Sequence, residues 1–473
     1  MSYFHGLEIE KSWNDTIYQV VRLDFSSLAG RSVSSFKNGL MRRILKNFKI
    51  HELDILKKYD NPSDLLVDIL DDQDNNSLVL LIDEYDAPLT HNINRSRKLN
   101  EIMDLLSDFY ATIKQYTDKF RLIFITGITR ANHVSIFSSF NNLKDISLEN
   151  EYNDLLEFKY NDPENYFDLH VARAANILNM KKEDVYRRLK EHYEGFQFSP
   201  AAKDTLYNPW SILNFLGSPE NGFCNYWFNS GVTPSIVMNY LKVNESFNFL
   251  DYTKRDSFIE INRLSRKYEI TALPIDILLY QTGYLTLRSE PHGKLHLVLA
   301  NTEVEESLLQ LYLEENNLLP SEQLSRKMDD IIQYINKKDI VGIVNIFNLI
   351  LNEYTSILSN IFNDERSVRD LLYAALIQIP SLQKVKERET VLGKSDLELI
   401  TSEVCMIIEF KRTYPNRGPD ASLHMAIDQI EKNRYGFLFS QSHMVYRVAM
   451  VISIEEKKIL KNYCKIVQSI WFS

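Results

Sequence analysis

The segment VLGKSDLELITSEVCMIIEFKR, residues 391–412, supports two different interpretations. The tripeptide GKS at residues 393–395 matches the end of a phosphate-binding loop. Asp396, followed by EFK at residues 409–411, instead matches a pair of metal-binding acids with a neighbouring lysine. The two interpretations predict different folds for this part of the chain, so the choice between them comes first.

The phosphate-loop interpretation fails on spacing and on local structure. Such a loop needs the pattern G-x-x-x-x-G-K-[ST] between a buried strand and a helix, so that backbone N–H groups face the phosphates. Arg388 stands five positions before Gly393, where the first glycine is required, and DLELI after Ser395 alternates like a strand. The full pattern occurs nowhere in the sequence.

The metal interpretation agrees with strand geometry. Side chains alternate along a strand, so Glu409 and Lys411 share one face while Phe410 points into the core. If DLELI pairs antiparallel with VCMIIEFK, Asp396 lies beside Glu409. A divalent cation offsets the repulsion between two such carboxylates, and their oxygens suit Mg²⁺ or Mn²⁺.

These residues lie within a helix-strand-strand-strand-helix-strand pattern that resembles the PD-(D/E)XK nuclease superfamily. The resemblance implies that Asp396 and Glu409 bind Mg²⁺ or Mn²⁺ together with the backbone carbonyl of Phe410. It also implies that Lys411 is the catalytic lysine.

The same resemblance implies two further site residues. Family members place an additional acid on the preceding helix or strand, and both Glu365 and Glu389 are candidates here. They also carry a glutamine on the following helix, which corresponds to Gln429 in AIDQIEKNRYG.

The first 150 residues have a different pattern. IYQVVRLDF (residues 17–25), SLVLLIDEYDAPL (77–89) and FRLIFITGITR (120–130) are apolar runs separated by helical stretches. Such runs predict a parallel sheet that is covered by helices on both faces.

Nearly the whole chain resembles a family of microbial proteins in which an AAA-ATPase-like domain precedes a nuclease-like domain. LVLLIDEYDAPL is similar to the family's Walker B strand. By that resemblance, Asp83 helps to hold Mg²⁺, Glu84 orients the attacking water and Thr126 lies near a sensor position. Family members also have a phosphate loop on a central strand, and this sequence lacks it. The chain is therefore truncated, or its domain is a decayed scaffold, or another chain or copy completes it.

The predicted fold is α/β and multidomain. Residues 1–150 form an AAA-like parallel sheet without its phosphate-loop strand. Residues 151–345 form a helical and winged-helix-like region that includes a hairpin, GYLTLR and KLHLVLA. Residues 346–473 form a restriction-endonuclease-like α/β domain.

Composition limits the range of functions. The net charge of −10 excludes a uniformly basic nucleic-acid-binding surface, although residues 361–473 hold 16 Lys and Arg against 14 Asp and Glu. The three cysteines, Cys224, Cys405 and Cys464, form no C-x-x-C pair and are expected in the core. The sequence shows no signal peptide and no membrane span, so we expect a cytoplasmic protein without a membrane partner.

The sequence therefore predicts a Mg²⁺- or Mn²⁺-dependent nuclease that acts on nucleic acid, DNA ahead of RNA. One alternative is an ATP-binding regulatory switch, although no phosphate loop is present to hold ATP. Another is a non-catalytic interaction scaffold.

Overall fold

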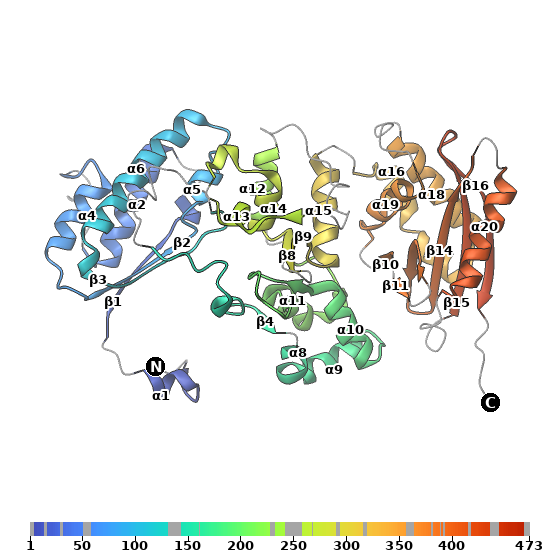
Figure 1. Ribbon diagram of the computed structural model, residues 1–473, viewed down its shortest axis with the longest axis horizontal. Coiled ribbons are helices and arrows are strands. Elements are labelled where there is room, and N and C mark those ends of the chain that lie inside the picture. The colour runs from blue at the N-terminus through green and yellow to red at the C-terminus, as the bar shows by residue number, and fades with distance from the viewer. Residues whose placement is uncertain are drawn as a thin grey trace. The chain divides into compact units, whose positions relative to one another are not determined.

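The fold of the 473-residue chain is given by a computed structural model (Figure 1). The chain forms two compact units, and each unit is assembled from stretches that are separated in the sequence. The first contains Met1–Asn153, Gln197–Ala202 and Gly231–Leu299, and the second contains Asp154–Phe196, Lys203–Ser230 and Ala300–Ser473. The structure describes residues 4–13, 17–28, 32–50, 58–130, 143–159, 161–227, 232–241, 258–266, 268–289, 294–315, 319–355, 364–379, 382–387, 389–390, 393–414, 418–435 and 444–467.

A parallel sheet of three strands lies near the N-terminus, as the apolar runs predict. The strands are β1 (Gln19–Asp24), β2 (Leu78–Asp83) and β3 (Phe120–Ile125), with β2 in the centre. The register pairs Asp24 with Asp83, so the carboxyl ends of β1 and β2 lie at the same edge of the sheet.

Three amphipathic helices cover one face of this sheet (Figure 1). They are α2 (Val33–Asn47), α4 (Pro62–Asp71) and α6 (Ser96–Gln115), and each contacts the other two. Ser32 and Asn61 cap the first two helices by accepting hydrogen bonds from backbone N–H groups of the first turn. Beneath these helices lie the inward side chains of the strands, which include Val21, Leu23, Leu78, Leu80 and Ile82.

The prediction that helices cover both faces of this sheet is wrong for the described residues. Val20 is 51% exposed and Leu122 is 50% exposed, and both point away from the face that α2, α4 and α6 cover. Because these helices also pack against one another, they all lie on the same side. The apolar runs therefore reflect one buried face and one open apolar face.

The predicted hairpin is also present in the first unit. Strands β8 (Leu285–Ser289) and β9 (Leu295–Leu299) pair antiparallel, and β7 (Phe258–Ile259) pairs with the other edge of β9. The turn between β8 and β9 lies outside the described residues.

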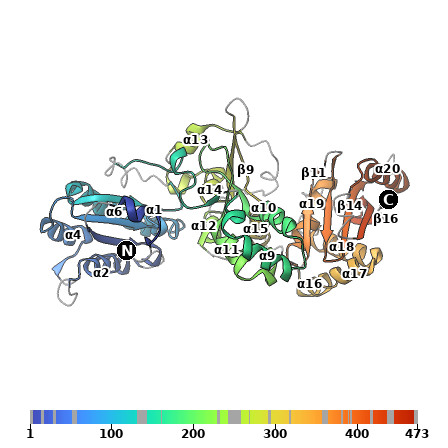
Figure 2. The same ribbon diagram turned by 90° about the horizontal axis from the view of Figure 1, so that it is seen from below.

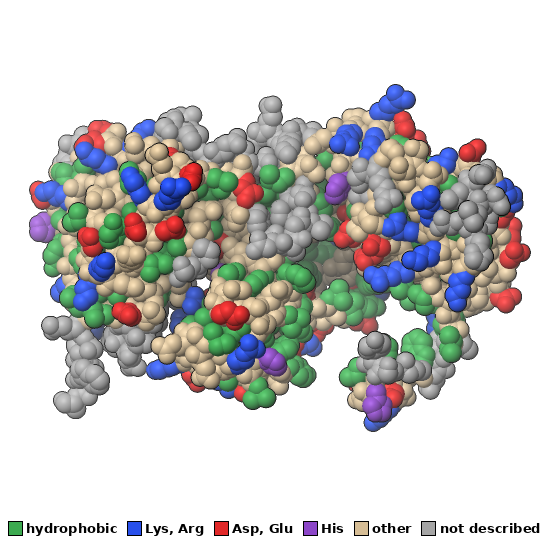
Figure 3. Space-filling model, turned by 180° about the vertical axis from the view of Figure 1, so that it is seen from behind, with side chains coloured by type: hydrophobic (Ala, Val, Ile, Leu, Met, Phe, Trp, Pro, Cys, Tyr) green, Lys and Arg blue, Asp and Glu red, His purple; other side chains and the backbone are tan. Residues whose placement is uncertain are grey.

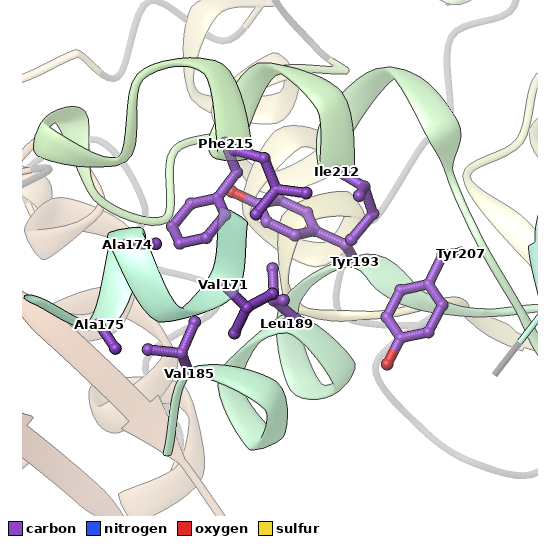
Figure 4. Close-up of a cluster of buried hydrophobic side chains, with 10 residues drawn as sticks. Val171, Ala174, Ala175, Val185, Leu189, Tyr193, Tyr207, Ile212 and Phe215 are labelled. Atoms are coloured by element: carbon purple, nitrogen blue, oxygen red, sulfur yellow. The ribbon is translucent and has the colours of Figure 1, made fainter. Parts of the chain in front are cut away.

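The second unit begins with a helical core (Figure 4). Helices α9 (Asp168–Ile177), α10 (Lys182–Tyr193) and α11 (Pro209–Gly217) meet around one cluster of buried side chains. Strand β5 (Glu194–Phe196) follows α10, and α15 (Thr302–Glu315) packs against α10. Gly195 has φ +122°, and a Cβ atom there would lie 2.0 Å from the carbonyl oxygen of Ala300. Only glycine fits this close approach.

A five-stranded sheet completes the second unit. Its order is β10 (Gln383–Lys386), β13 (Leu397–Ile400), β14 (Val404–Arg412), β15 (Met444–Ser453) and β16 (Lys458–Val467). Only β14 and β15 pair in parallel, and α20 (Pro419–Lys432) connects them. Helix α20 covers one face and α18 (Ile340–Thr355) covers the other, as the two views agree (Figures 1 and 2).

Strand β16 was not predicted from the sequence. The polar run IEEKK, residues 454–458, forms the turn before this strand and ends at Lys458, the first residue of β16. Most of the side chains of β16 are exposed or half-buried because it lies at the edge of the sheet. A half-exposed edge strand lacks the apolar alternation by which strands are recognised.

No helix in the described part of the chain combines the length and the apolar composition that crossing a bilayer requires.

Candidate active site

The predicted acids meet at one end of the five-stranded sheet. Strands β13 and β14 pair antiparallel with Leu397 opposite Ile408, which confirms the predicted pairing. One step further, the same register places Asp396 opposite Glu409. Residues 393–394 form the short strand β12 (Gly393–Lys394), which pairs with β11 (Glu389–Thr390). The GKS tripeptide thus lies in a hairpin and opens no helix.

Asp396 is fixed through both its backbone and its side chain. Its Oδ2 accepts a hydrogen bond of 2.8 Å from the backbone N–H of Phe410. Its carbonyl oxygen accepts one of 3.2 Å from the backbone N–H of Glu387. Burial raises the pKa of the Asp396 carboxyl, and the hydrogen bond from Phe410 opposes that rise.

Glu409 is the most deeply buried acid of the site, with 1% of its side chain exposed. Its Oε1 accepts a hydrogen bond of 2.8 Å from Nζ of Lys411, whereas its Oε2 is buried and has no hydrogen-bond partner among the described residues. Burial, and then the charge of Asp396, raise the pKa of Glu409 to about 7.

Lys411 lies on the same face of β14 as Glu409, and Phe410 between them is fully buried, as the alternation predicts. The side chain of Lys411 is 22% exposed, so it lies at the boundary between the protein interior and solvent. Burial lowers the pKa of Lys411, but the charge of Glu409, with those of the other acids, outweighs it. The net shift is upward, so Lys411 carries a positive charge.

Glu365 is a third acid at this site. It is the first residue of α19 (Glu365–Leu376), and its Oε1 accepts a hydrogen bond of 3.0 Å from the backbone N–H of Arg412. Its charge raises the pKa of both Asp396 and Glu409. The side chain of Glu389, the alternative acid, lies outside the described residues.

Gln429 is linked to the hairpin through Tyr435. Its amide nitrogen lies 3.4 Å from the hydroxyl oxygen of Tyr435, and that hydroxyl donates to the carbonyl of Lys394. No contact of Gln429 with Asp396, Glu409 or Lys411 is found in the described part of the chain. The structure thus places Gln429 on the neighbouring helix without bringing it to the acids.

The donor set fits a hard divalent cation. Two carboxylates lie on adjacent strands, and one of their oxygens is buried without a partner. Within the described ranges, no three His, Cys, Asp or Glu side chains form a complete metal-binding group. Mg²⁺ commonly takes only one or two carboxylates and keeps several waters, so a pair of carboxylates such as Asp396 and Glu409 is compatible with it.

The second predicted constellation lies at the carboxyl edge of the parallel sheet. The hydroxyl of Thr126 donates to Oδ1 of Asp83 over 2.7 Å. Glu84 has φ +51°, which is rare for a residue with a side chain. Burial, and then the charge of Asp24, raise the pKa of Glu84. The structure therefore brings Asp83 and Thr126 into contact, and Glu84 is the next residue after Asp83.

Asp86 was missed by sequence reasoning. It is 1% exposed, and its carboxylate accepts hydrogen bonds from the backbone N–H groups of Ile128, at 3.1 Å, and Thr129, at 2.6 Å. A Cβ atom at Gly127 would lie 2.6 Å from Oδ1 of Asp86. Asp86 holds the segment after β3 in place through these hydrogen bonds. Its position two residues after Glu84 is the feature of the sequence that could have identified it.

Comparison with known proteins finds a similar family for the N-terminal part of the chain. Residues 1–137 match the model of a family described as "Predicted AAA-ATPase". An "Uncharacterized protein in vnfD 5'region" from Azotobacter chroococcum mcd 1 is 28% identical over 246 residues. This alignment covers 50% of the chain and 44% of that relative, so the chain matches less than half of the relative's length. No solved structure matches the chain.

Proposed function

We propose that the C-terminal sheet carries a Mg²⁺- or Mn²⁺-dependent nuclease site that hydrolyses phosphodiester bonds of DNA, or of RNA. One observation carries this proposal: Glu409 is buried beside the half-buried Asp396, with Nζ of Lys411 2.8 Å from Oε1 of Glu409 and with Oε2 of Glu409 unpartnered among the described residues. Such an arrangement is unfavourable without a cation.

Each residue then has a defined role. Asp396 and Glu409 would hold the cation together with the carbonyl of Phe410. When bound, such a cation polarises a phosphodiester oxygen and lowers the pKa of a bound water. Lys411 is charged and reaches solvent, so it can orient the attacking water or stabilise the charge that develops on the phosphate.

Basic side chains close to the site would have to attract the negatively charged nucleic acid. The chain is acidic overall, and the face drawn in Figure 3 carries interspersed acidic and basic side chains. A nucleic acid would therefore bind through local charges near the acids, of which Lys411 and Arg412 are the nearest in sequence. We therefore expect the nucleic acid to bind weakly, and its affinity to fall as the salt concentration rises.

We expect the substitutions Asp396→Ala and Lys411→Ala to abolish metal-dependent cleavage of single- and double-stranded DNA or RNA. Loss of a group that stabilises developing charge lowers the rate by about 10²–10³-fold. Cleavage in Mn²⁺ or Mg²⁺ is measured with labelled oligonucleotides. Lys458→Ala is the matched control, because Lys458 forms an exposed ion pair of 2.7 Å on β16.

Retained cleavage in the Asp396 variant would reject the site. Absence of both cleavage and metal binding in the wild-type protein would favour the non-catalytic scaffold.

A second candidate function is a nucleotide-dependent switch in the N-terminal sheet. The match of residues 1–137 to a predicted AAA-ATPase family and the 2.7 Å contact between Thr126 and Asp83 favour it. The sequence contains no phosphate loop to complete that site.

A further inference from the structure

We propose that Arg369 is a positioning residue for the C-terminal site, and that it acts on Asp396 through Glu387. This inference rests on the proposed nuclease function for its chemical meaning. The proposed series of contacts that holds Asp396 in place can be tested without measuring cleavage.

The guanidinium of Arg369 is buried and contacts two acids, Asp370 and Glu387. Arg369 lies on α19 one turn after Glu365, and its side chain is 7% exposed. Its Nη1 donates to Oε1 of Glu387 over 2.6 Å, and its Nε donates to Oδ1 of Asp370 over 2.9 Å. Planar guanidinium groups hold carboxylates with a defined direction, so Glu387 is held in one orientation.

Glu387 stands at the base of the hairpin that leads to Asp396. It directly follows β10 and has φ +51°, a conformation that residues with side chains adopt rarely. Such a conformation persists where the surroundings enforce it. Glu387 extends the antiparallel pairing of β10 with β13, in which Lys386 lies opposite Leu397, and its backbone N–H donates to the carbonyl of Asp396 over 3.2 Å. The contact with Arg369 holds the side chain of Glu387 at this end of the pairing.

The contacts form a continuous path from helix to site. Arg369 contacts Glu387, the N–H of Glu387 contacts Asp396, and the carboxylate of Asp396 accepts from Phe410 at 2.8 Å. Asp396 is therefore held at its carbonyl by one strand and at its carboxylate by the next. Release of Glu387 would loosen the first of these contacts and let the hairpin carry Asp396 away from Glu409.

A purely structural role makes a different prediction. Arg369 also belongs to a buried network in which Lys386 pairs with Glu305 at 2.6 Å. If the network only stabilised the fold, loss of either pair would lower stability and leave Asp396 in place. The Lys386–Glu305 pair is therefore the matched control, since it makes no contact with Asp396 among the described residues.

The experiment compares Glu387→Ala, Glu387→Gln and the control Glu305→Ala. The side chain of Glu387 is 43% exposed, so its loss leaves no large cavity. Two measurements are made: hydrogen exchange at the Phe410 amide in metal-free protein, and Mn²⁺ affinity by calorimetry. For Glu387→Ala we expect about tenfold faster exchange and a 10–100-fold weaker Kd, the usual range for loss of a group that supports a metal ligand.

Glu387→Gln keeps one acceptor oxygen for Arg369 and should restore most of both values. Glu305→Ala should change neither value, even if it lowers the melting temperature. Unchanged Phe410 exchange in Glu387→Ala would overturn the positioning role, and so would an equal effect of Glu305→Ala. If wild-type protein bound no Mn²⁺, the proposed function would fail, while the Phe410 exchange would still decide the positioning role.

Discussion

Glu409 keeps its proton to an unusually high pH because it is buried beside a second carboxyl group. Its pKa rises from 4.5 to about 7 in the folded protein. Between these two pH values the folded chain binds more protons than the unfolded chain, so this group's contribution to stability is lost as the pH rises through that window. Below about pH 4.5 the contribution is fully present.

The same pKa predicts that metal binding releases a proton. A carboxyl group must be deprotonated to bind a cation, so Mn²⁺ should displace the proton of Glu409 at pH 6.5 and displace less at pH 8. Mn²⁺ affinity should therefore rise with pH up to about 7 and then level off. Calorimetry in two buffers of different ionisation enthalpy measures the number of protons released.

Glu409→Gln is the control for this measurement, because it is neutral at every pH and should lose both binding and proton release. Tight Mn²⁺ binding at pH 6.5 without proton release would contradict the assignment of Glu409.

The sequence predicted the site residues that lie on two neighbouring strands, because antiparallel pairing places Asp396 beside Glu409. Strand alternation was enough to put Glu409 and Lys411 on one face and Phe410 in the core. It could not identify Arg369 or Glu387, because their roles arise from contacts between α19, β10 and the hairpin. The pattern of apolar and polar residues within one helix or strand does not tell which side chains from distant parts of the sequence will contact it.

At the scale of elements, the sequence predicted most strands of the two sheets better than it predicted which faces of the sheets are covered by helices. Long buried strands such as β2 and β14 have continuous apolar runs, which are recognisable in sequence. The open face of the N-terminal sheet was not recognisable, because Val20 and Leu122 are apolar although they are exposed. Hydrophobicity alone does not distinguish a covered face from one left open.

Gly195 provides a test at this scale. Its φ of +122° and its 2.0 Å approach to the carbonyl of Ala300 leave no space for a side chain. We expect Gly195→Ala to lower the free energy of unfolding by about 3 kcal/mol or more, through strain and the displacement of α15. Chemical denaturation followed by tryptophan fluorescence measures the change.

Gly217→Ala is the matched control. A Cβ at this helical position meets nothing within 4 Å, so alanine should be neutral or stabilise by about 0.5–1 kcal/mol. A similar loss of stability in both variants would show that the close approach at residue 195 is not the cause.

At the scale of the whole molecule, two candidate sites lie in different units of one chain. Asp83 and Thr126 belong to the first unit, and Asp396 and Glu409 belong to the second. The first has acids and a hydroxyl at a sheet edge, but the sequence offers no loop to hold phosphates beside them. The second has acids and a lysine together. The proposed chemistry at the C-terminal site rests on that arrangement.

Accordingly, millimolar ATP with Mg²⁺ should leave the melting temperature of the chain unchanged. A ligand present at 100 times its Kd stabilises a protein by about 2.7 kcal/mol, which a thermal shift would detect. Asp83→Ala should likewise leave metal-dependent cleavage unchanged. A rise in melting temperature with ATP that Asp83→Ala removes would support the nucleotide switch instead.

The interleaving of the two units bears on how the protein is made. Helices α9 to α11 emerge from the ribosome long before α15, which packs against α10 in the same unit. At the usual pace of synthesis, the delay between Gly195 and Ala300 is roughly 5–20 s. During that time the nascent chain exposes apolar surface that its own later residues will cover. Chaperones that bind nascent chains should therefore associate with the middle of this protein.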